Sequence, residues 1–180
     1  VLAIVNNKKH AAAAFRATRE RVGPAGVFHL SAAMCPKHRS DVLDQIKAVP
    51  ADDQPCRVIS TQVVEAGVDI DFPVVLRAAA GLDSVAQAAG RCNREGRLDA
   101  GEVIVFDTDW KPAPMVARQA DTAREIAGLH DDLLSLEAVE HYFRLHYWSQ
   151  QATWDKHGIA AMFDLQNYVF QFREAAERYR

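Results

Sequence analysis

The feature that most constrains the fold is a regular alternation, from Val1 to Phe106, of short apolar runs with segments of helical spacing. The runs are rich in β-branched residues and are too short for helices, so we expect them to be buried strands. They are Val1 to Val5, Val27 to Leu30, Val58 to Ser60, Val74 to Leu76 and Val103 to Phe106. Helices are expected between them at Ala11 to Val22 and over Val42 to Val49. This order predicts an α/β fold whose mostly parallel sheet is covered by helices on both faces.

The predicted sheet also indicates where functional residues should lie. In parallel sheets, the loops at the carboxyl ends of the strands form the binding edge, so we expect the functional side chains just after strands. The 180 residues are 49% hydrophobic, which is enough for one domain with a substantial core and an appendage.

Beyond Asp107 the pattern changes, because Pro112 and Pro114 interrupt it and no further strand is expected. Helices are predicted at Met115 to Leu129, Leu133 to Trp148 and His157 to Arg178. We therefore predict an α/β domain over residues 1–110 and a helical extension over residues 111–180. Ten of the fifteen aromatic residues fall between Tyr142 and Tyr179, so the extension is expected to pack on something else.

The composition excludes several classes of protein. The net charge is −3, with 21 basic and 24 acidic side chains, so any contact with nucleic acid must be local. The widely spaced Cys35, Cys56 and Cys92 predict neither a zinc ribbon nor a disulfide framework, and they fit a reducing cytoplasm. No apolar run approaches the ~20 residues that span a bilayer, so no membrane segment is predicted. Since the sequence starts at Val1 within an expected strand and without Met, we expect it to be a piece of a longer protein.

The strongest chemical signal is the arginine segment, residues 87–96, which a helix cap at Asp83 or Ser84 would precede. On a helix, offsets of three, four and seven residues place four of its side chains on one face. They are Gln87, Gly90, Arg91 and Arg94. Guanidinium pairs suit bidentate phosphate recognition and can stabilise charge on a transferring phosphoryl group. An arbitrary arginine pair more often forms exposed ion pairs with carboxylates than it binds phosphate, so the neighbouring sequence has to decide between these two roles.

A second polar region, the serine-threonine segment of residues 60–72, follows the third expected strand. The hydroxyls of Ser60 and Thr61 can donate to a nucleic-acid phosphate, a contact that positions a strand without reading its sequence. Asp69 suits a ribose hydroxyl or a metal-bound water. A strand that ends in Ser-Thr is equally compatible with capping of the next helix.

The two segments together resemble motifs V and VI of superfamily 2 helicases, through Ser-Thr-Gln-x-x-Glu-x-Gly-Val-Asp and Gln-x-x-Gly-Arg-x-x-Arg. The complete sequences of three segments are similar to the CRISPR-associated helicase–nuclease of type I systems, namely residues 29–39, 65–72 and 87–96. This resemblance covers residues 1 to 107. It implies that residues 1–110 are the second RecA-like domain of a helicase motor and that residues 111–180 lead toward a further C-terminal domain.

The resemblance also implies roles at an ATP site. Arg91 and Arg94 would approach the γ-phosphate as catalytic residues, and Gln87 would lie beside them. Gly67 and Asp69 would face the nucleotide.

The same resemblance implies a nucleic-acid site and partners. Ser60 and Thr61 would lie on the backbone of single-stranded DNA, and Arg39 is a weaker candidate because an arginine at a helix start is usually solvated. The implied partners are a nuclease domain of the same parent chain and an RNA-guided surveillance complex. The implied activity is ATP-driven, 3′-to-5′ translocation on DNA during antiviral interference.

Half of an ATP site is missing from the sequence, which contains no G-x-x-x-x-G-K-[ST] loop and no Asp-Glu pair at a strand end. We therefore expect ATP and Mg²⁺ to be held mainly by a first RecA-like domain outside this chain, and the chain to be inactive as an ATPase without it. Closure of the two domains would deliver the arginines and drive stepping.

Histidines offer no convincing metal site. His130-Asp131 is a dipeptide of the kind that binds metal in the nuclease of the resembling family, but no second ligand cluster with helical spacing surrounds it. His141 and His146 fall on different helix faces, and His157 is isolated. No metal ligand is therefore predicted.

A different class of function stays open. The chain could be a non-catalytic RecA-like docking module that binds nucleic acid or a protein complex, and the aromatic-rich extension slightly favours this alternative.

Overall fold

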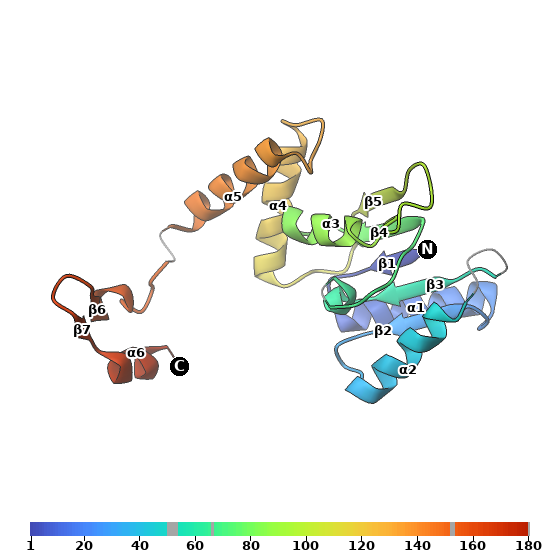
Figure 1. Cartoon of the computed structure of the whole chain (residues 1–180), viewed down its shortest axis with the longest axis horizontal. Helices are drawn as coiled ribbons and strands as arrows, with labels where there is room; N and C mark the ends of the chain where they lie inside the picture. The colour runs from blue at the N-terminus through green and yellow to red at the C-terminus, as the bar shows by residue number, and fades with distance from the viewer. Residues whose placement is uncertain (50–53, 66, 152–153, 180) are drawn as a thin grey trace. The chain divides into compact units, whose positions relative to one another are not determined.

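The computed structural model describes residues 1–49, 54–65, 67–151 and 154–179, and contains a five-stranded parallel sheet in the order β2-β3-β1-β4-β5 (Figure 1). The strands are β1 (Leu2–Ile4), β2 (Val27–Leu30), β3 (Arg57–Ser60), β4 (Val74–Ala78) and β5 (Glu102–Phe106). All four strand pairings in this sheet are parallel. The predicted strands and fold class are confirmed, but β5 at the edge of the sheet is not buried as expected, since Ile104 and Val105 are 41% and 46% exposed.

Three helices cover the sheet, α1 (Lys8–Val22), α2 (Pro36–Lys47) and α3 (Leu82–Ala89). One core cluster joins Ile46 of α2 and Ala88 of α3 to strand residues such as Leu2 and Val75. The other joins Ala11 of α1 to the opposite face of the sheet. Helix α1 begins where the Asn7 side chain accepts a hydrogen bond of 2.7 Å from the amide of His10, a standard N-cap.

The remaining helices are α4 (Pro114–Ala127), α5 (Leu136–Gln150) and α6 (Phe172–Arg178). The first two agree with the predicted helices. The chain divides into two compact units, Val1–Tyr142 and Phe143–Arg180, and each is described by itself below. The first unit therefore extends further along the chain than the α/β domain predicted over residues 1–110.

The long helix predicted at His157 to Arg178 is wrong, because most of this range is not α-helical. It contains a short 3₁₀ helix, η3 (Ala160–Met162), and a two-stranded antiparallel hairpin of β6 (Phe163–Asp164) and β7 (Val169–Phe170) before α6. The Asp164 carboxylate accepts hydrogen bonds of 3.0 Å from the amides of Gln166 and Asn167, and Tyr168 has a φ of 56°. This local capping stabilises a turn that competes with the helix.

In the ranges that the structure describes, no helix combines the length and apolar character needed to cross a bilayer.

Candidate functional site

The arginine segment does not form the predicted helix stripe. The N-cap residue of helix α3 is Gly81 rather than Asp83 or Ser84, no side chain caps the helix, and it ends at Ala89. Of the four residues expected on one helical face, only Gln87 is helical, because Gly90 is the C-cap and Asn93 has a φ of 47°. The argument from helical periodicity is therefore wrong, and any association of Arg91 with Arg94 depends on tertiary contacts.

Those contacts are made with the serine-threonine segment. Phe72 pairs with Cys92 in a parallel bridge, in which the Phe72 amide donates to the Arg91 carbonyl at 3.0 Å and the Asn93 amide donates to the Phe72 carbonyl at 2.9 Å. Phe72 lies two residues before β4 begins, so the arginine segment reaches the amino-terminal edge of the sheet. The arginine segment therefore does not lie just after a strand, where functional side chains were expected.

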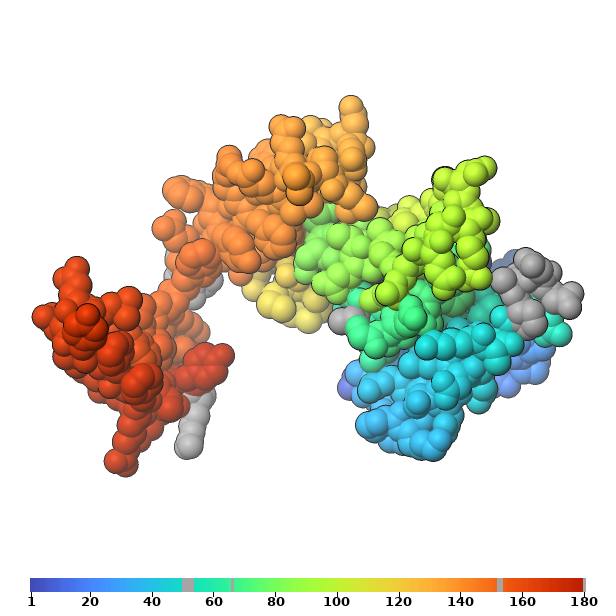
Figure 2. Space-filling model, in the orientation of Figure 1, coloured from blue at the N-terminus to red at the C-terminus, as the bar shows by residue number. Residues whose placement is uncertain are grey.

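Arg94 lies on the surface beside two aspartates of the serine-threonine segment. Its guanidinium forms an ion pair with the carboxylate of Asp69, and both side chains are exposed. The Asp71 carboxylate accepts a hydrogen bond of 2.8 Å from the Arg94 amide and lies 3.6 Å from the guanidinium of Arg97. Asp71 therefore fixes the backbone at Arg94, while Asp69 holds its side chain. Residues 94–100 are exposed throughout and form part of the surface seen in Figure 2.

Arg91 is held more firmly than Arg94. Its Nε donates to the carbonyl of Val64 at 3.0 Å, and its Nη2 donates to the carbonyl of Glu65 at 2.7 Å. Both carbonyls belong to the 3₁₀ turn η1 (Gln62–Val64) and its C-cap, directly after β3. Two charge-assisted bonds to one turn fix the plane of the guanidinium.

Gln87 and Gly67 are exposed, so both are accessible to a ligand. Gly67 has a φ of 70°, which L side chains rarely adopt, and this turns the chain toward Asp69. Ala66, which the resemblance includes in the motif, lies outside the described residues.

The residues predicted to bind nucleic acid lie at the opposite, carboxyl-terminal edge of the sheet. Ser60 is fully buried and donates to the Thr61 carbonyl at 2.8 Å, which argues against a direct phosphate contact by its side chain. Thr61 is 4% exposed, and its hydroxyl has no hydrogen-bond partner among the described residues. Arg39 lies in the first turns of α2, after β2, and is half-buried.

The sequence analysis missed a buried ion pair next to these residues. Arg77 of β4 is completely buried, and its Nε lies 2.9 Å from a carboxylate oxygen of Glu65, which is 7% exposed. Nη1 of Arg77 donates to the Asn6 side chain and to the Ala78 carbonyl, each at 2.7 Å. Asn6 in turn donates to the Ala79 carbonyl at 2.8 Å. The signal in the sequence was a single arginine within an otherwise apolar strand, since a buried charge requires a partner.

Burial raises the pKa of the Glu65 carboxyl, while the positive charge of Arg77 and a hydrogen bond from Ser84 oppose that shift. Burial likewise lowers the pKa of Arg77, and Glu65 opposes it. Each charge is therefore expensive to bury alone and is compensated mainly by the other.

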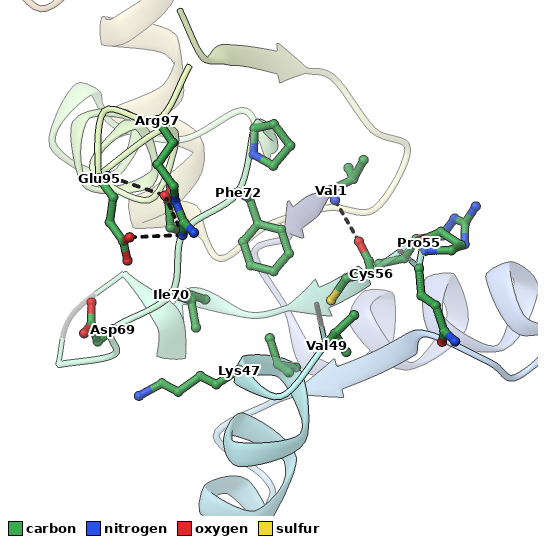
Figure 3. A pocket seen from close by; sticks show the side chains of 15 residues that line it. Val1, Lys47, Val49, Pro55, Cys56, Asp69, Ile70, Phe72, Glu95 and Arg97 are labelled. Atoms are coloured by element: carbon green, nitrogen blue, oxygen red, sulfur yellow. Dashed lines mark hydrogen bonds and ion pairs between the residues drawn. The ribbon is translucent and has the colours of Figure 1, made fainter. Parts of the chain in front are cut away.

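A hollow of about 710 Å³ opens at the amino-terminal edge of the sheet, between α2 and the two segments (Figure 3). Asp69, Ile70 and Phe72 contribute to its wall from one segment, and Glu95 and Arg97 contribute from beyond Arg94. The hollow thus adjoins the surface that carries the predicted nucleotide-facing side chains.

Among the residues described, no group of three or more His, Cys, Asp or Glu side chains is arranged to hold a metal ion. Nε2 of His130 lies 3.0 Å from Nδ1 of His141, a partner that the spacing of the histidines in the sequence did not indicate. These two histidines form a hydrogen-bonded pair on their own.

Comparison with known proteins decides the family. A family profile described as "CRISPR-associated nuclease/helicase Cas3, C-terminal" matches residues 1–97, more than half of the chain. The chain belongs to this Cas3 C-terminal family. The profile contains both the serine-threonine segment and the arginine segment, so the family resemblance read from them is confirmed.

A curated relative, the CRISPR-associated nuclease/helicase Cas3 of Methanothermobacter thermautotrophicus, is 31% identical over 137 residues, which are 73% of this chain and 16% of the relative. The chain therefore spans about a sixth of that relative.

Two solved structures share the fold. The crystal structure of T. fusca Cas3-ATP matches with a TM-score of 0.56 and 16% identity, over 84% of this chain and 22% of that one. A chain of a "CRISPR RNA-guided surveillance complex, pre-nicking" matches with a TM-score of 0.52 and 14% identity, over 94% of this chain and 24% of that one. At these identities the likeness establishes the RecA-like fold alone.

Proposed function

We propose that this chain is the second motor domain of an ATP-driven helicase that translocates on single-stranded DNA in CRISPR interference. The observation that carries the proposal is the Phe72–Cys92 bridge, which places the arginine segment, with Arg91 and Arg94, beside the serine-threonine segment that contains Asp69. A first RecA-like domain, which this sequence does not contain, would hold the phosphate loop and the magnesium ligands.

The side chains present fit one side of a nucleoside triphosphate. Guanidinium groups offer donors to phosphate oxygens, and the Asp69 carboxylate can accept from ribose hydroxyls. They fit Mg²⁺ poorly, because Asp69 is paired with Arg94 and Asp71 is engaged by the Arg94 amide and by Arg97. Magnesium ligands are therefore expected from the first domain.

The two arginines would act differently. Arg91 is anchored through Nε and Nη2, and its Nη1 group, which has no partner among the described residues, would meet the γ-phosphate. Arg94 would exchange Asp69 for phosphate, and Asp69 would then be free to accept from the ribose. When bound, ATP supplies the γ-phosphoryl group, whose developing charge the preorganised Arg91 and the released Arg94 would stabilise.

The DNA backbone would lie at the carboxyl-terminal edge, where Thr61 and Arg39 are placed. The segment that begins at Thr61 is proposed to lie against the DNA backbone. The buried Ser60 hydroxyl is excluded as a direct contact. Recruitment by an RNA-guided surveillance complex is proposed because one structural neighbour is part of such an assembly.

The test replaces Arg94 or Arg91 with alanine in the complete gene product. We expect the DNA-stimulated kcat for ATP to fall by about 10³- to 10⁵-fold, the range attributed to arginine fingers, with little change in the Kd for single-stranded DNA. Arg173→Ala, in the exposed helix α6, is a matched control that should hydrolyse ATP normally. Unchanged hydrolysis in both the Arg91 and Arg94 variants would instead support the docking module.

A further inference from the structure

Among the described contacts, Glu65 is the one residue that both Arg91 and the buried Arg77 contact. Its main-chain carbonyl accepts the 2.7 Å bond from Nη2 of Arg91, and its side chain faces the buried Arg77 at 2.9 Å. Two different arginines therefore contact the two ends of one residue. One of them is fully buried in the sheet, and the other belongs to the proposed ATP site.

We propose that Glu65 is a positioning residue that acts through Arg91, with Arg77 as its fixed anchor. This inference rests on the proposed function and adds to it a residue that touches neither nucleotide nor DNA. The Glu65 side chain, held by Arg77, fixes the orientation of the peptide whose carbonyl orients the Arg91 guanidinium.

The anchor is rigid because Arg77 cannot move without breaking several buried contacts. Its Nη1 bonds tie it to Asn6, after β1, and to the end of β4, while Asn6 is tied to Ala79. A fully buried arginine does not adopt alternative rotamers easily, since its charge must keep its partners.

The turn is held in the core through Val64, which is fully buried, and the Glu65–Arg77 pair adds a constraint at its end. Helix η1 is a single 3₁₀ turn without a side-chain cap at Thr61, and the chain after it passes through the left-handed Gly67. Without the Glu65–Arg77 pair, the Glu65 carbonyl that holds Nη2 of Arg91 would lose the side-chain contact that fixes its residue.

The network also reaches the proposed DNA edge. Thr61 starts the turn and Asn6 follows β1, so both lie at the carboxyl-terminal edge, whereas Arg91 belongs to the segment that reaches the amino-terminal edge. Displacement of Asn6 by a bound strand would be transmitted through Arg77 and Glu65 to Arg91, whereas Thr61 is connected to Glu65 only along the turn. Stimulation of hydrolysis by DNA should therefore depend on the ion pair.

The experiment uses the complete gene product with the double substitution Glu65→Leu/Arg77→Met, which removes both charges and keeps similar volumes, a change that buried ion pairs often tolerate. We expect the DNA-stimulated kcat to fall by about 10- to 100-fold, because about 1 Å of misplacement can cost about 10²-fold. The KM for ATP and the Kd for single-stranded DNA should change little. Glu174→Leu/Arg178→Met makes the same replacements in an exposed pair of α6 and should be fully active.

A double-mutant cycle separates positioning from a general structural role. In an Arg91→Ala background, Glu65→Leu/Arg77→Met should lower kcat no further, because its effect passes through Arg91. Full additivity of the two losses would overturn the inference. Wild-type kcat for Glu65→Leu/Arg77→Met, or full activity of Arg91→Ala by itself, would overturn this inference alone, whereas full activity of both Arg91→Ala and Arg94→Ala would overturn the proposed function as well.

Should the double variant not fold, Glu65→Asp provides the test. It keeps the buried charge compensated and shortens the side chain by one carbon. A reduced kcat that is not additive with Arg91→Ala supports positioning, and an unchanged kcat refutes it.

Discussion

Replacing either Glu65 or Arg77 alone should destabilise the fold, and the two variants should differ in how their loss of stability depends on pH. Arg77 is completely buried and Glu65 is 7% exposed, so removing one partner leaves the other as an uncompensated charge. Losses of about 3 to 5 kcal/mol in the free energy of unfolding are typical for such changes. The two single variants differ in whether the remaining charge can be neutralised by a proton.

In Arg77→Met, the stranded Glu65 can take up a proton. Its unperturbed pKa is 4.5, so protonation at pH 7 costs about 3.4 kcal/mol, at about 1.36 kcal/mol for each of the 2.5 pH units. At pH 5 the same protonation costs only about 0.7 kcal/mol. The folded-state pKa of Glu65 is then raised above its unfolded value, which favours the folded state at low pH and is lost as pH rises. The Arg77→Met penalty should therefore shrink by up to about 2.7 kcal/mol between pH 7 and pH 5.

In Glu65→Leu, the stranded Arg77 has no comparable relief, because a guanidinium stays charged throughout this range. Its penalty should be the same at pH 7 and pH 5. Glu65→Leu/Arg77→Met should lie near wild type at both values, since neither charge remains.

The assay is urea unfolding of this chain followed by circular dichroism, with hydrogen exchange of the β4 amides reporting the first unit specifically. Each variant is compared with wild type at the same pH. Equal Arg77→Met penalties at pH 7 and pH 5, or a Glu65→Leu penalty that disappears at pH 5, would refute the reasoning.

Two further predictions concern the backbone and the histidines. Gly67→Ala should lower the free energy of unfolding by about 1 to 2 kcal/mol, because its φ of 70° is strained for any side chain although no atom lies within 4 Å of a new Cβ. Gly96→Ala, with a φ of 63° and equally open surroundings, should lose a similar amount in the same urea titration, and a much larger loss at Gly67 alone would indicate an unrecognised contact. Burial lowers the pKa of His29 below 6.5, and the nearby His38 adds to the shift, so its stabilising contribution is complete above pH 6.5 and is lost as the pH falls. His29→Phe, which can keep the stacking on Phe15, should lose less Tm between pH 7.5 and pH 5.5 than wild type, and an identical loss would contradict this assignment.

The sequence by itself determined the strands, the first helices and the family. The short length and β-branched content of the runs favour strands, and the two motif segments are recognisable whatever backbone conformation they adopt. The hairpin at Phe163 to Phe170 was not predictable in this way, because local capping by Asp164 and a left-handed Tyr168 override an apparently helical pattern.

Only the tertiary structure decided how the site is assembled. Periodicity placed Arg91 and Arg94 on one helix, but helix α3 ends at Ala89, and long-range contacts with Val64, Glu65 and Asp69 position the two arginines instead. The partner of Arg77 was equally hidden, because residues 65 and 77 meet only when the sheet brings the turn after β3 against β4. Periodicity reports the local backbone, whereas the partner of a buried charge is set by which distant segments share the same core.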